Sequence, residues 1–313
     1  GTFNPAANAV TVHGDWVVPA AGTFTSSGTV TFDGGSTQSI NAGGTGTGVD
    51  DTSNDFNNLT ITGSTLQLVT SELEVDGTLT ISASKILDLN GQDLDLNGTL
   101  DNPGTLLLQG DETVAIGVMD SAEGLVKFDG STGTITNGIT TYYNLEFDET
   151  IDGQTFTLPD SNITVNGALT ITDAVVAFDN DKNLTINDNG ATGTALTIIA
   201  AGTLNNTGTG NLTIGGAVSN AGVISFDSSG GGGGDADSIQ LRSSVNDTSR
   251  NWQGAGTFTM TDVDVKDQTA IGGTPATITV TSGTDSDSGG NTNWLFLGGS
   301  LTSLSVTPGS LAT

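Results

Sequence analysis

The chain of 313 residues contains no cysteine, one histidine and only six lysines and arginines. The absence of cysteine excludes a disulfide framework and a thiolate metal site. The chain has six basic and 35 acidic residues, which gives a net charge of −29. This balance excludes a nucleic-acid-binding protein, because too few cations are present to replace the counterions of a phosphate backbone. It also disfavours direct docking on anionic lipid.

Long apolar segments are missing as well. No apolar run approaches the roughly 20 residues that span a bilayer, so we expect no transmembrane segment. The first residues, 1–9, lack the basic and then apolar pattern of a signal peptide. A mature chain that has lost its signal peptide, or a processed or excised chain, would begin in this way.

Helix-forming segments are also absent, and the chain is instead rich in glycine and in short strand-like units. Glycine accounts for 46 residues, and Gly, Asn or Asp bound each unit. Within a unit Leu and Ile alternate with Thr, which places the apolar side chains on one face and the threonines on the other. The units are 58–63, 77–82, 167–172, 183–187 and 211–215.

A longer repeat is superimposed on these units. Phe32-Asp33-Gly34 recurs as Phe128-Asp129-Gly130 and, more loosely, as Phe226-Asp227-Ser228, so the period is about 95 residues. Repetition at two scales indicates an array whose units bury their apolar faces only by stacking. We predict an all-β fold, an elongated right-handed parallel β-helix or β-solenoid, since crossovers between parallel strands are right-handed.

The predicted β-solenoid covers residues 1–297 as about three degenerate superrepeats of about 95 residues. Its amino-terminal part is rich in large apolar residues and would cap one end. Residues 298–313 are interpreted as a C-terminal strand or linker, leading to a following module or to a neighbouring subunit. Asparagines that recur beside the strands, such as Asn58, Asn144 and Asn183, are expected to stack and to satisfy turn amides.

A string of β-sandwich domains is the competing architecture. Asn97-Gly98 and Asn166-Gly167 have the composition of two-residue hairpin turns, which join antiparallel strands. The solenoid is preferred because the strand units are short, the apolar stripe is narrow and few bulky aromatic residues are present to fill a sandwich core. Trp16, Trp252 and Trp294 are interpreted as padding or capping the core, and stacking on sugars is the alternative.

Several segments together resemble a repeat common in very large bacterial surface and adhesin-like proteins. They are Val12-His-Gly-Asp-Trp16, Gly22-Thr-Phe24, 28–34, 38–40 and 56–61, with 262–264 and 291–296 near the end. Residues 304–310 resemble the start of an Ig-like module that follows in such chains. The resemblance implies a secreted right-handed parallel β-helix without known catalysis, and it carries over no catalytic residue.

Some β-helix proteins are enzymes, since pectate lyases and polygalacturonases share this architecture. Glycoside hydrolysis requires carboxylates gathered on one patch. Asp50-Asp51 is the only Asp-Asp pair, His13 is the only histidine, and the lysines and arginines are scattered singly. We therefore predict that the protein is not an enzyme.

Calcium is the cofactor that the acidic residues suit best, since hard cations prefer oxygen ligands. Asp285, Asp287 and Asn291 place alternate oxygen donors around a glycine-containing turn, without the terminal Glu of an EF-hand. Asp262 and Asp264 form a second candidate metal site, and they share one face if Val263 and Val265 point inward.

We expect a non-enzymatic extracellular structural or adhesive protein, a cell-surface or filament-forming β-solenoid subunit. A carbohydrate-binding or polysaccharide-degrading β-helix protein is the alternative. The expected partners are further copies of the chain in a fibre or layer, or host and surface glycans. Leu301, Leu304 and Val306 alternate with polar residues, and we expect this segment to add a strand to a neighbouring subunit's sheet edge.

Overall fold

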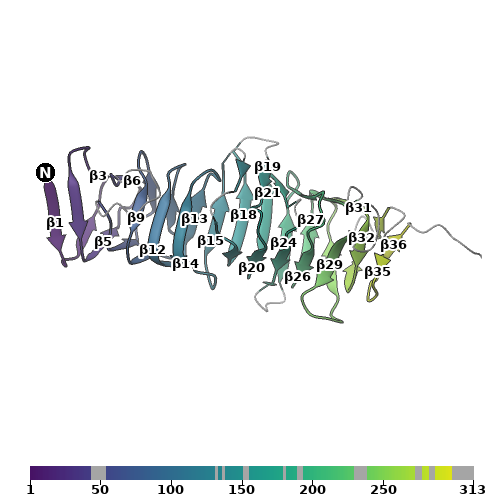
Figure 1. The fold of residues 1–313 in the computed structure, drawn as a ribbon. Coiled ribbons are helices and arrows are strands. Elements are labelled where there is room, and N and C mark those ends of the chain that lie inside the picture. Colours follow the sequence, from purple (N-terminus) through teal and green to yellow (C-terminus); the bar gives the residue numbers. More distant parts are fainter. Residues whose placement is uncertain are drawn as a thin grey trace, which may run out of the picture.

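The computed structural model describes residues 1–43, 54–130, 133–135, 138–150, 155–178, 181–188, 193–228, 238–271, 277–281 and 286–297. These residues form β-strands and turns, with no α-helix among them. The strands stack one after another along a long axis, with the N-terminus at one end (Figure 1). The all-β prediction is confirmed.

The strands belong to four long sheets and one small pair. Sheet I contains β2 (Val10–Val12), β5 (Thr29–Phe32), β7 (Asn58–Ile61), β10 (Thr78–Ile81), β12 (Leu94–Asp101) and β14 (Val114–Val118), with β9 (Leu73–Val75) also paired to β12. Sheet II contains β3 (Trp16–Val17), β6 (Thr37–Asn41), β8 (Thr65–Leu68), β11 (Ile86–Asp88), β13 (Thr105–Leu108), β15 (Leu125–Phe128), β18 (Asn144–Asp148), β21 (Leu169–Asp173), β24 (Thr194–Ile198), β27 (Ala217–Asn220), β30 (Arg250–Gln253) and β33 (Gln268–Ala270).

Sheets III and IV occupy the carboxyl-terminal two thirds of the stack. Sheet III contains β16 (Gly133–Thr134), β19 (Thr155–Thr157), β22 (Val175–Ala177), β25 (Thr203–Asn206), β28 (Val223–Asp227), β31 (Thr257–Thr261), β34 (Ile278–Val280) and β36 (Trp294–Phe296). Sheet IV contains β17 (Thr141–Tyr142), β20 (Ile163–Val165), β23 (Leu184–Ile186), β26 (Leu212–Ile214), β29 (Ile239–Ser243), β32 (Val263–Val265) and β35 (Ser286–Asp287). The small pair joins β1 (Thr2–Ala6) to β4 (Thr23–Ser26).

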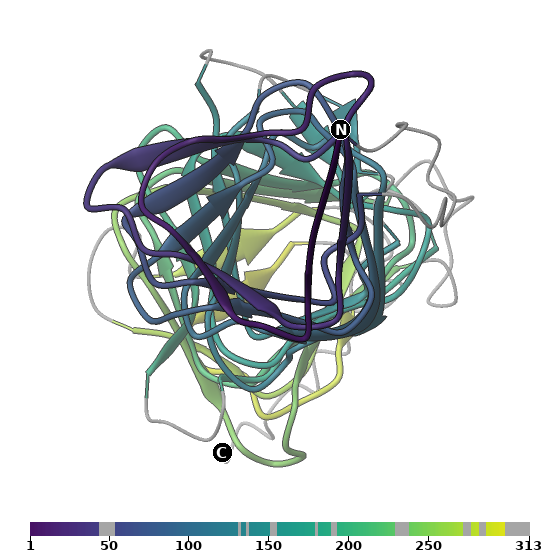
Figure 2. The ribbon, with the colours of Figure 1, turned by 90° about the vertical axis from the view of Figure 1, so that its left-hand side faces the viewer.

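The chain visits these sheets in a fixed rotation. Up to β15 it alternates mainly between sheets I and II, and from β15 to β35 it passes through sheets II, III and IV in turn. Each such circuit adds one strand to each sheet, parallel to the strand of the circuit before it, as in β18 with β21 and β21 with β24. Viewed from the amino-terminal end, the circuits surround a common interior (Figure 2). This arrangement of parallel strands in long sheets is compatible with a β-solenoid.

The Leu-Thr-Ile units stack in register, as their alternation predicts. Leu59 and Ile61 pair with Leu79 and Ile81 in sheet I, and all four are fully buried. The intervening Thr60 is half-buried on the outer face. Burying one such side chain is worth roughly 1.5–3 kcal/mol, so a strand of three or four residues contributes stability only when its neighbours cover it.

The interior is one contiguous apolar cluster along the stack. Aromatic side chains pack together at several levels of it, with Trp16 on Phe24 near the amino-terminal end and Phe128 stacked on Phe147 in the middle. Near the other end Trp252 is buried and packs edge-on against Trp294, with ring centroids 5.4 Å apart. These tryptophans pad the core, as predicted.

The antiparallel hairpins of the sandwich alternative do not occur at the two Asn-Gly pairs. Asn97-Gly98 lies inside β12, whose partners β10 and β14 are both parallel to it. Asn166-Gly167 connects β20 to β21, which belong to different sheets. A single ideal Cβ on Gly98 would lie 1.8 Å from the Gly77 carbonyl oxygen, so glycine here allows close contact between successive circuits rather than a turn.

Asparagine side chains bind the circuits together outside the core. The Asn58 Oδ1 accepts a hydrogen bond from the Thr78 amide over 2.8 Å, one circuit away. Asn144 does the same for the Ala168 amide, and Asn183 for the Asn211 amide. The prediction that these asparagines accept from amides of a neighbouring circuit is confirmed, but the three do not stack on one another, because they lie in sheet I, in sheet II and beside sheet IV.

The phenylalanines of the long repeat are all fully buried, but they do not share a sheet. Phe32 lies in sheet I, Phe128 in sheet II and Phe226 in sheet III. The unit that recurs in the structure is the shorter circuit through sheets II, III and IV.

Candidate functional site

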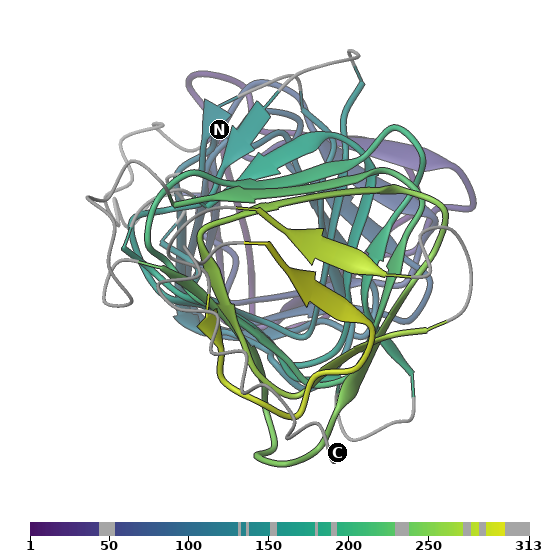
Figure 3. The ribbon, with the colours of Figure 1, turned by 90° about the vertical axis from the view of Figure 1, so that its right-hand side faces the viewer.

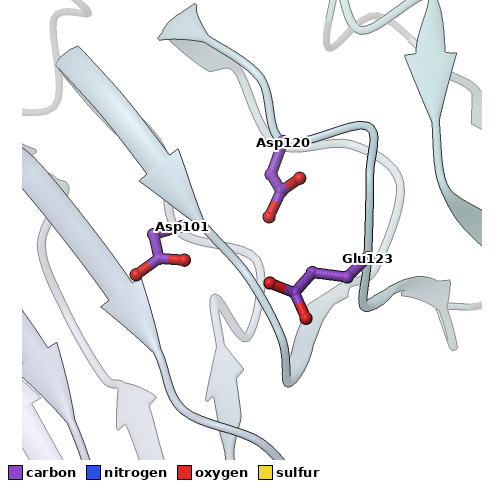
Figure 4. A group of neighbouring side chains, drawn as sticks. All are labelled: Asp101, Asp120 and Glu123. Carbon is purple, nitrogen blue, oxygen red and sulfur yellow. The ribbon is translucent and has the colours of Figure 1, made fainter.

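Three carboxylates from two neighbouring segments gather on the surface between sheets I and II. Asp101 is the last residue of β12, and Asp120 and Glu123 lie in the turn between β14 and β15 (Figure 4). One oxygen of each side chain lies within 4.8 Å of the others. Cations such as calcium hold oxygen ligands at 2.3–2.6 Å, so oxygens with this spacing fit around one ion.

Hydrogen bonds orient two of the three carboxylates. Asp120 accepts from the Asn102 amide over 3.0 Å and from the Ala122 amide over 2.9 Å. Asp101 accepts from the Thr80 hydroxyl over 3.2 Å. Glu123 is exposed. Asp120 and Asp101 are therefore held in place by hydrogen bonds even without a cation. The exposed Glu123 side chain would become ordered only when a cation binds.

The donor set determines which chemistry this cluster suits. It offers carboxylate oxygens alone, which favour calcium or magnesium over zinc or copper. Sequence inspection missed the cluster, because Asp120 and Glu123 gain their third partner only through the parallel register that brings β12 beside the turn after β14. The only signal in the sequence is the short spacing between Asp120 and Glu123, and this spacing does not reveal Asp101.

The predicted site at Asp262 and Asp264 is buried. Val263 and Val265 point into the core, and Asp262 and Asp264 are also at least nine-tenths buried. Asp264 forms an ion pair with the Arg242 guanidinium, which also donates to the Asp264 carbonyl oxygen over 2.6 Å. Asp262 accepts a hydrogen bond from the Ser238 hydroxyl over 3.1 Å. Arg242 supplies positive charge at the place where the metal was predicted, and metal binding here stays a prediction.

The other predicted site is only partly described. Asp285 lies outside the described residues. Asp287 accepts from the Gly289 amide over 2.9 Å and from the Asn291 side chain over 2.7 Å. Asn291 also accepts from the Gln268 amide and donates to the Val265 carbonyl oxygen. The Asn291 side chain therefore ties this turn to the preceding circuit, as asparagines do elsewhere in the stack.

Several further predicted residues fall outside the described part of the chain. They are Asp50 and Asp51, weighed for catalysis, and Leu301, Leu304 and Val306, predicted for self-assembly. His13 is described, and its Nδ1 lies 2.5 Å from the Asp33 carboxylate on an exposed surface.

Comparison of the chain with family models, curated proteins and solved structures finds no match. Within the described residues, no helical segment has the length and apolarity needed to cross a bilayer.

Proposed function

We propose that the chain is a right-handed parallel β-helix that serves as a non-enzymatic, extracellular structural or adhesive protein. In this role the stacked circuits act as a long spacer, and the exposed faces of their sheets are available for contacts on a cell surface or within a filament. The handedness follows from the general preference for right-handed crossovers between parallel strands.

One observation carries the proposal. A single contiguous apolar cluster extends through successive parallel strands of the stack, from Phe24 near one end to Val280 near the other. Such a stack is stabilised between neighbouring circuits and can be extended in one dimension, which suits a spacer or scaffold. The elongated outline in Figure 1 agrees with this use.

The charge supports an extracellular role. A net charge of −29 keeps such a surface soluble, and it suits a medium whose divalent cations offset the repulsion between neighbouring copies. The exposed carboxylates of Asp101, Asp120 and Glu123 would then bind calcium from the medium and order the turn that carries them.

Labelling of intact cells tests the location. Antibodies raised against the purified chain are expected to decorate unbroken cells of the source organism in immunogold electron microscopy, and a cytoplasmic protein serves as the control that stays unlabelled. Detection of the antigen only after the cells are broken open would overturn the proposal.

Self-association is the second part of the proposal and has its own test. Among the described residues, each sheet ends at a strand that is paired along one edge only, such as β36 of sheet III (Figure 3). Such edges accept an added strand. We expect the chain to form oligomers in analytical ultracentrifugation, and the triple variant Leu301→Ser, Leu304→Ser, Val306→Ser to sediment as a monomer. Equal sedimentation of both proteins would contradict assembly through this segment.

A further inference from the structure

Three successive connections from sheet IV to sheet II differ in length, and a hollow lies over the shortest. The middle connection, from β26 to β27, consists only of Gly215 and Gly216. Its neighbours are longer, with residues 187–193 before β24 and 244–249 before β30. Described residues of all three connections line a cavity of about 420 Å³ that is open to solvent. This volume lies within the range of roughly 300–1,000 Å³ that small-molecule sites occupy.

A buried carboxylate without a partner lines this cavity. Asp188 is 8% exposed, yet its carboxylate forms no hydrogen bond or ion pair with any described residue. Two glycines that also line the cavity lie against it. An ideal Cβ on Gly216 would lie 2.4 Å from the Asp188 Oδ2, and one on Gly193 would lie 3.2 Å from Oδ1. The glycines therefore make room for this side chain.

The Asp188 oxygens are not among the fully buried polar atoms that lack a partner, so they reach the open cavity and contact water there. A ligand in the cavity would replace this water with direct hydrogen bonds to the carboxylate. The φ of 60° at Asp188 is the turn conformation that several other Asn and Asp residues of the chain also adopt. The carboxylate therefore faces the cavity from a turn, beside two glycines, with no described protein partner, and it can accept hydrogen bonds from a ligand.

Arg250 supplies hydrogen-bond donors to the same cavity. Its Nε donates to the Ser243 hydroxyl over 3.0 Å and one terminal nitrogen to the Ser244 hydroxyl over 3.3 Å. These contacts hold the guanidinium and leave other N–H groups available. Arg250 forms no ion pair with a described residue, although acidic residues outnumber basic ones 35 to 6. The Asn251 side chain, also at the cavity, is exposed and likewise forms no hydrogen bond with described residues.

These groups define the chemistry of the ligand. Asp188 only accepts hydrogen bonds, the Arg250 guanidinium only donates them, and the Asn251 amide does both. Asp188 and the net charge of −29 oppose an anion, whereas Arg250 opposes a metal cation. A neutral group with several adjacent hydroxyls satisfies all three side chains, since each hydroxyl both donates and accepts.

We propose that this cavity binds one unit of a neutral, hydroxyl-rich saccharide. The inference deepens the proposed function by naming the ligand class of an adhesive surface, and it rests on that function for its biological meaning only. No aromatic side chain lines the cavity to stack on a sugar ring. A single site is therefore weak, with a dissociation constant on the order of 1 mM, and display of many copies on one surface raises the avidity.

Saturation-transfer difference NMR on the full chain tests the site. The probes are glucose, galactose, mannose and N-acetylglucosamine, with glucuronate as the anionic and glycine as the zwitterionic comparator. We expect transfer to at least one neutral sugar. Asp188→Asn and Arg250→Gln are each expected to weaken its binding by about tenfold, which is 1.4 kcal/mol.

Matched controls keep the result decisive. Asp111→Asn makes the same change as Asp188→Asn, and Lys85→Gln likewise removes one positive charge, at residues that do not line the cavity; both variants are expected to bind as the unchanged chain does. Asn251→Ala alters an exposed side chain without described hydrogen bonds, so it tests the site even where Asp188→Asn destabilises the fold, and a loss of about threefold is expected. Far-ultraviolet circular dichroism verifies that each variant is folded.

The proposal is overturned if none of the neutral sugars binds, if their binding is unchanged in the folded cavity variants, or if only glucuronate or glycine binds there. These outcomes are separable from those of the cell-labelling experiment. A chain confined to the cytoplasm can still bind sugar, and a surface chain without sugar binding would leave the structural role intact.

Discussion

Truncation of one buried leucine tests how strongly neighbouring circuits depend on each other. Leu79 is fully buried in β10, with Leu59 of β7 on one side and Leu100 of β12 on the other. Leu79→Ala removes three carbons, which is a transfer loss of about 2.4 kcal/mol at about 0.8 kcal/mol for each carbon. The residual cavity adds about 1–2 kcal/mol, for a total of roughly 3.5–4.5 kcal/mol.

Urea unfolding followed by far-ultraviolet circular dichroism measures this loss. The control is Thr60→Ala, which alters an outward-facing residue of the adjacent strand and is expected to cost at most about 1 kcal/mol. Because stability in a stacked array is a sum over neighbours, hydrogen exchange in Leu79→Ala should speed up in β7, β10 and β12 and stay unchanged in β26. Equal losses in the two variants, or a uniform change in exchange along the chain, would refute the reasoning.

The remaining predictions concern a close contact, a titrating carboxylate and a cation. Gly98→Ala should destabilise strongly, because its Cβ would meet the Gly77 carbonyl oxygen at 1.8 Å, whereas Gly35→Ala, with open space around it, should unfold at the urea concentration of the unchanged chain. Burial, with a contribution from the neighbouring Asp88 carboxylate, raises the pKa of Asp129 from 3.8 to about 6. Protonation of Asp129 therefore stabilises the folded state; this stabilisation is complete below about pH 4 and is lost as the pH rises through about 6. Asp129→Asn should accordingly gain about 1 kcal/mol at about pH 8, after a discount for its partial exposure, and nothing at about pH 4; a gain at the lower pH alone would contradict this. Calcium should raise the melting temperature of the chain in calorimetry, and Glu123→Gln should reduce the rise; an equal rise in both proteins would remove Glu123 from the site.

Much of the fold was predictable because it depends on the alternation of apolar and polar residues within each strand. Leu, Thr and Ile in succession determine which side chains point inward in any strand, so the buried Leu184 and Ile186 and the outward-facing Thr185 followed from the pattern. The asparagine contacts between circuits were predictable for a similar reason, since a turn amide needs an acceptor from the next circuit. The hairpin reading of Asn97-Gly98 shows the limit, because the same pair also suits a strand that packs closely on its neighbour.

The sites were harder to predict, because they depend on the register between circuits. The cluster of Asp101, Asp120 and Glu123 exists only because one circuit places β12 beside the turn after β14. The saccharide cavity depends on the contrast between a two-residue connection at Gly215 and Gly216 and longer connections on both sides. No motif within a single segment predicts either the carboxylate cluster or the cavity. The difference between the connection lengths becomes visible only when the successive circuits are aligned.

The central claim is that residues far apart in sequence lie in one continuous stack, and a distance measurement between two spin labels tests it most directly. Gln67 of β8 and Thr197 of β24 are outward-facing residues in one column of sheet II, related through Asp88, Leu107, Lys127, Glu146 and Thr170. Six steps of about 4.8 Å between strands separate the two backbones by roughly 29 Å.

The chain has no cysteine, so Gln67→Cys and Thr197→Cys provide the only attachment points for the labels. Double electron–electron resonance is expected to give one narrow distribution near roughly 29 Å, broadened by the label arms. A broad distribution, or one centred well beyond roughly 45 Å as for separate domains in a string, would contradict the stack.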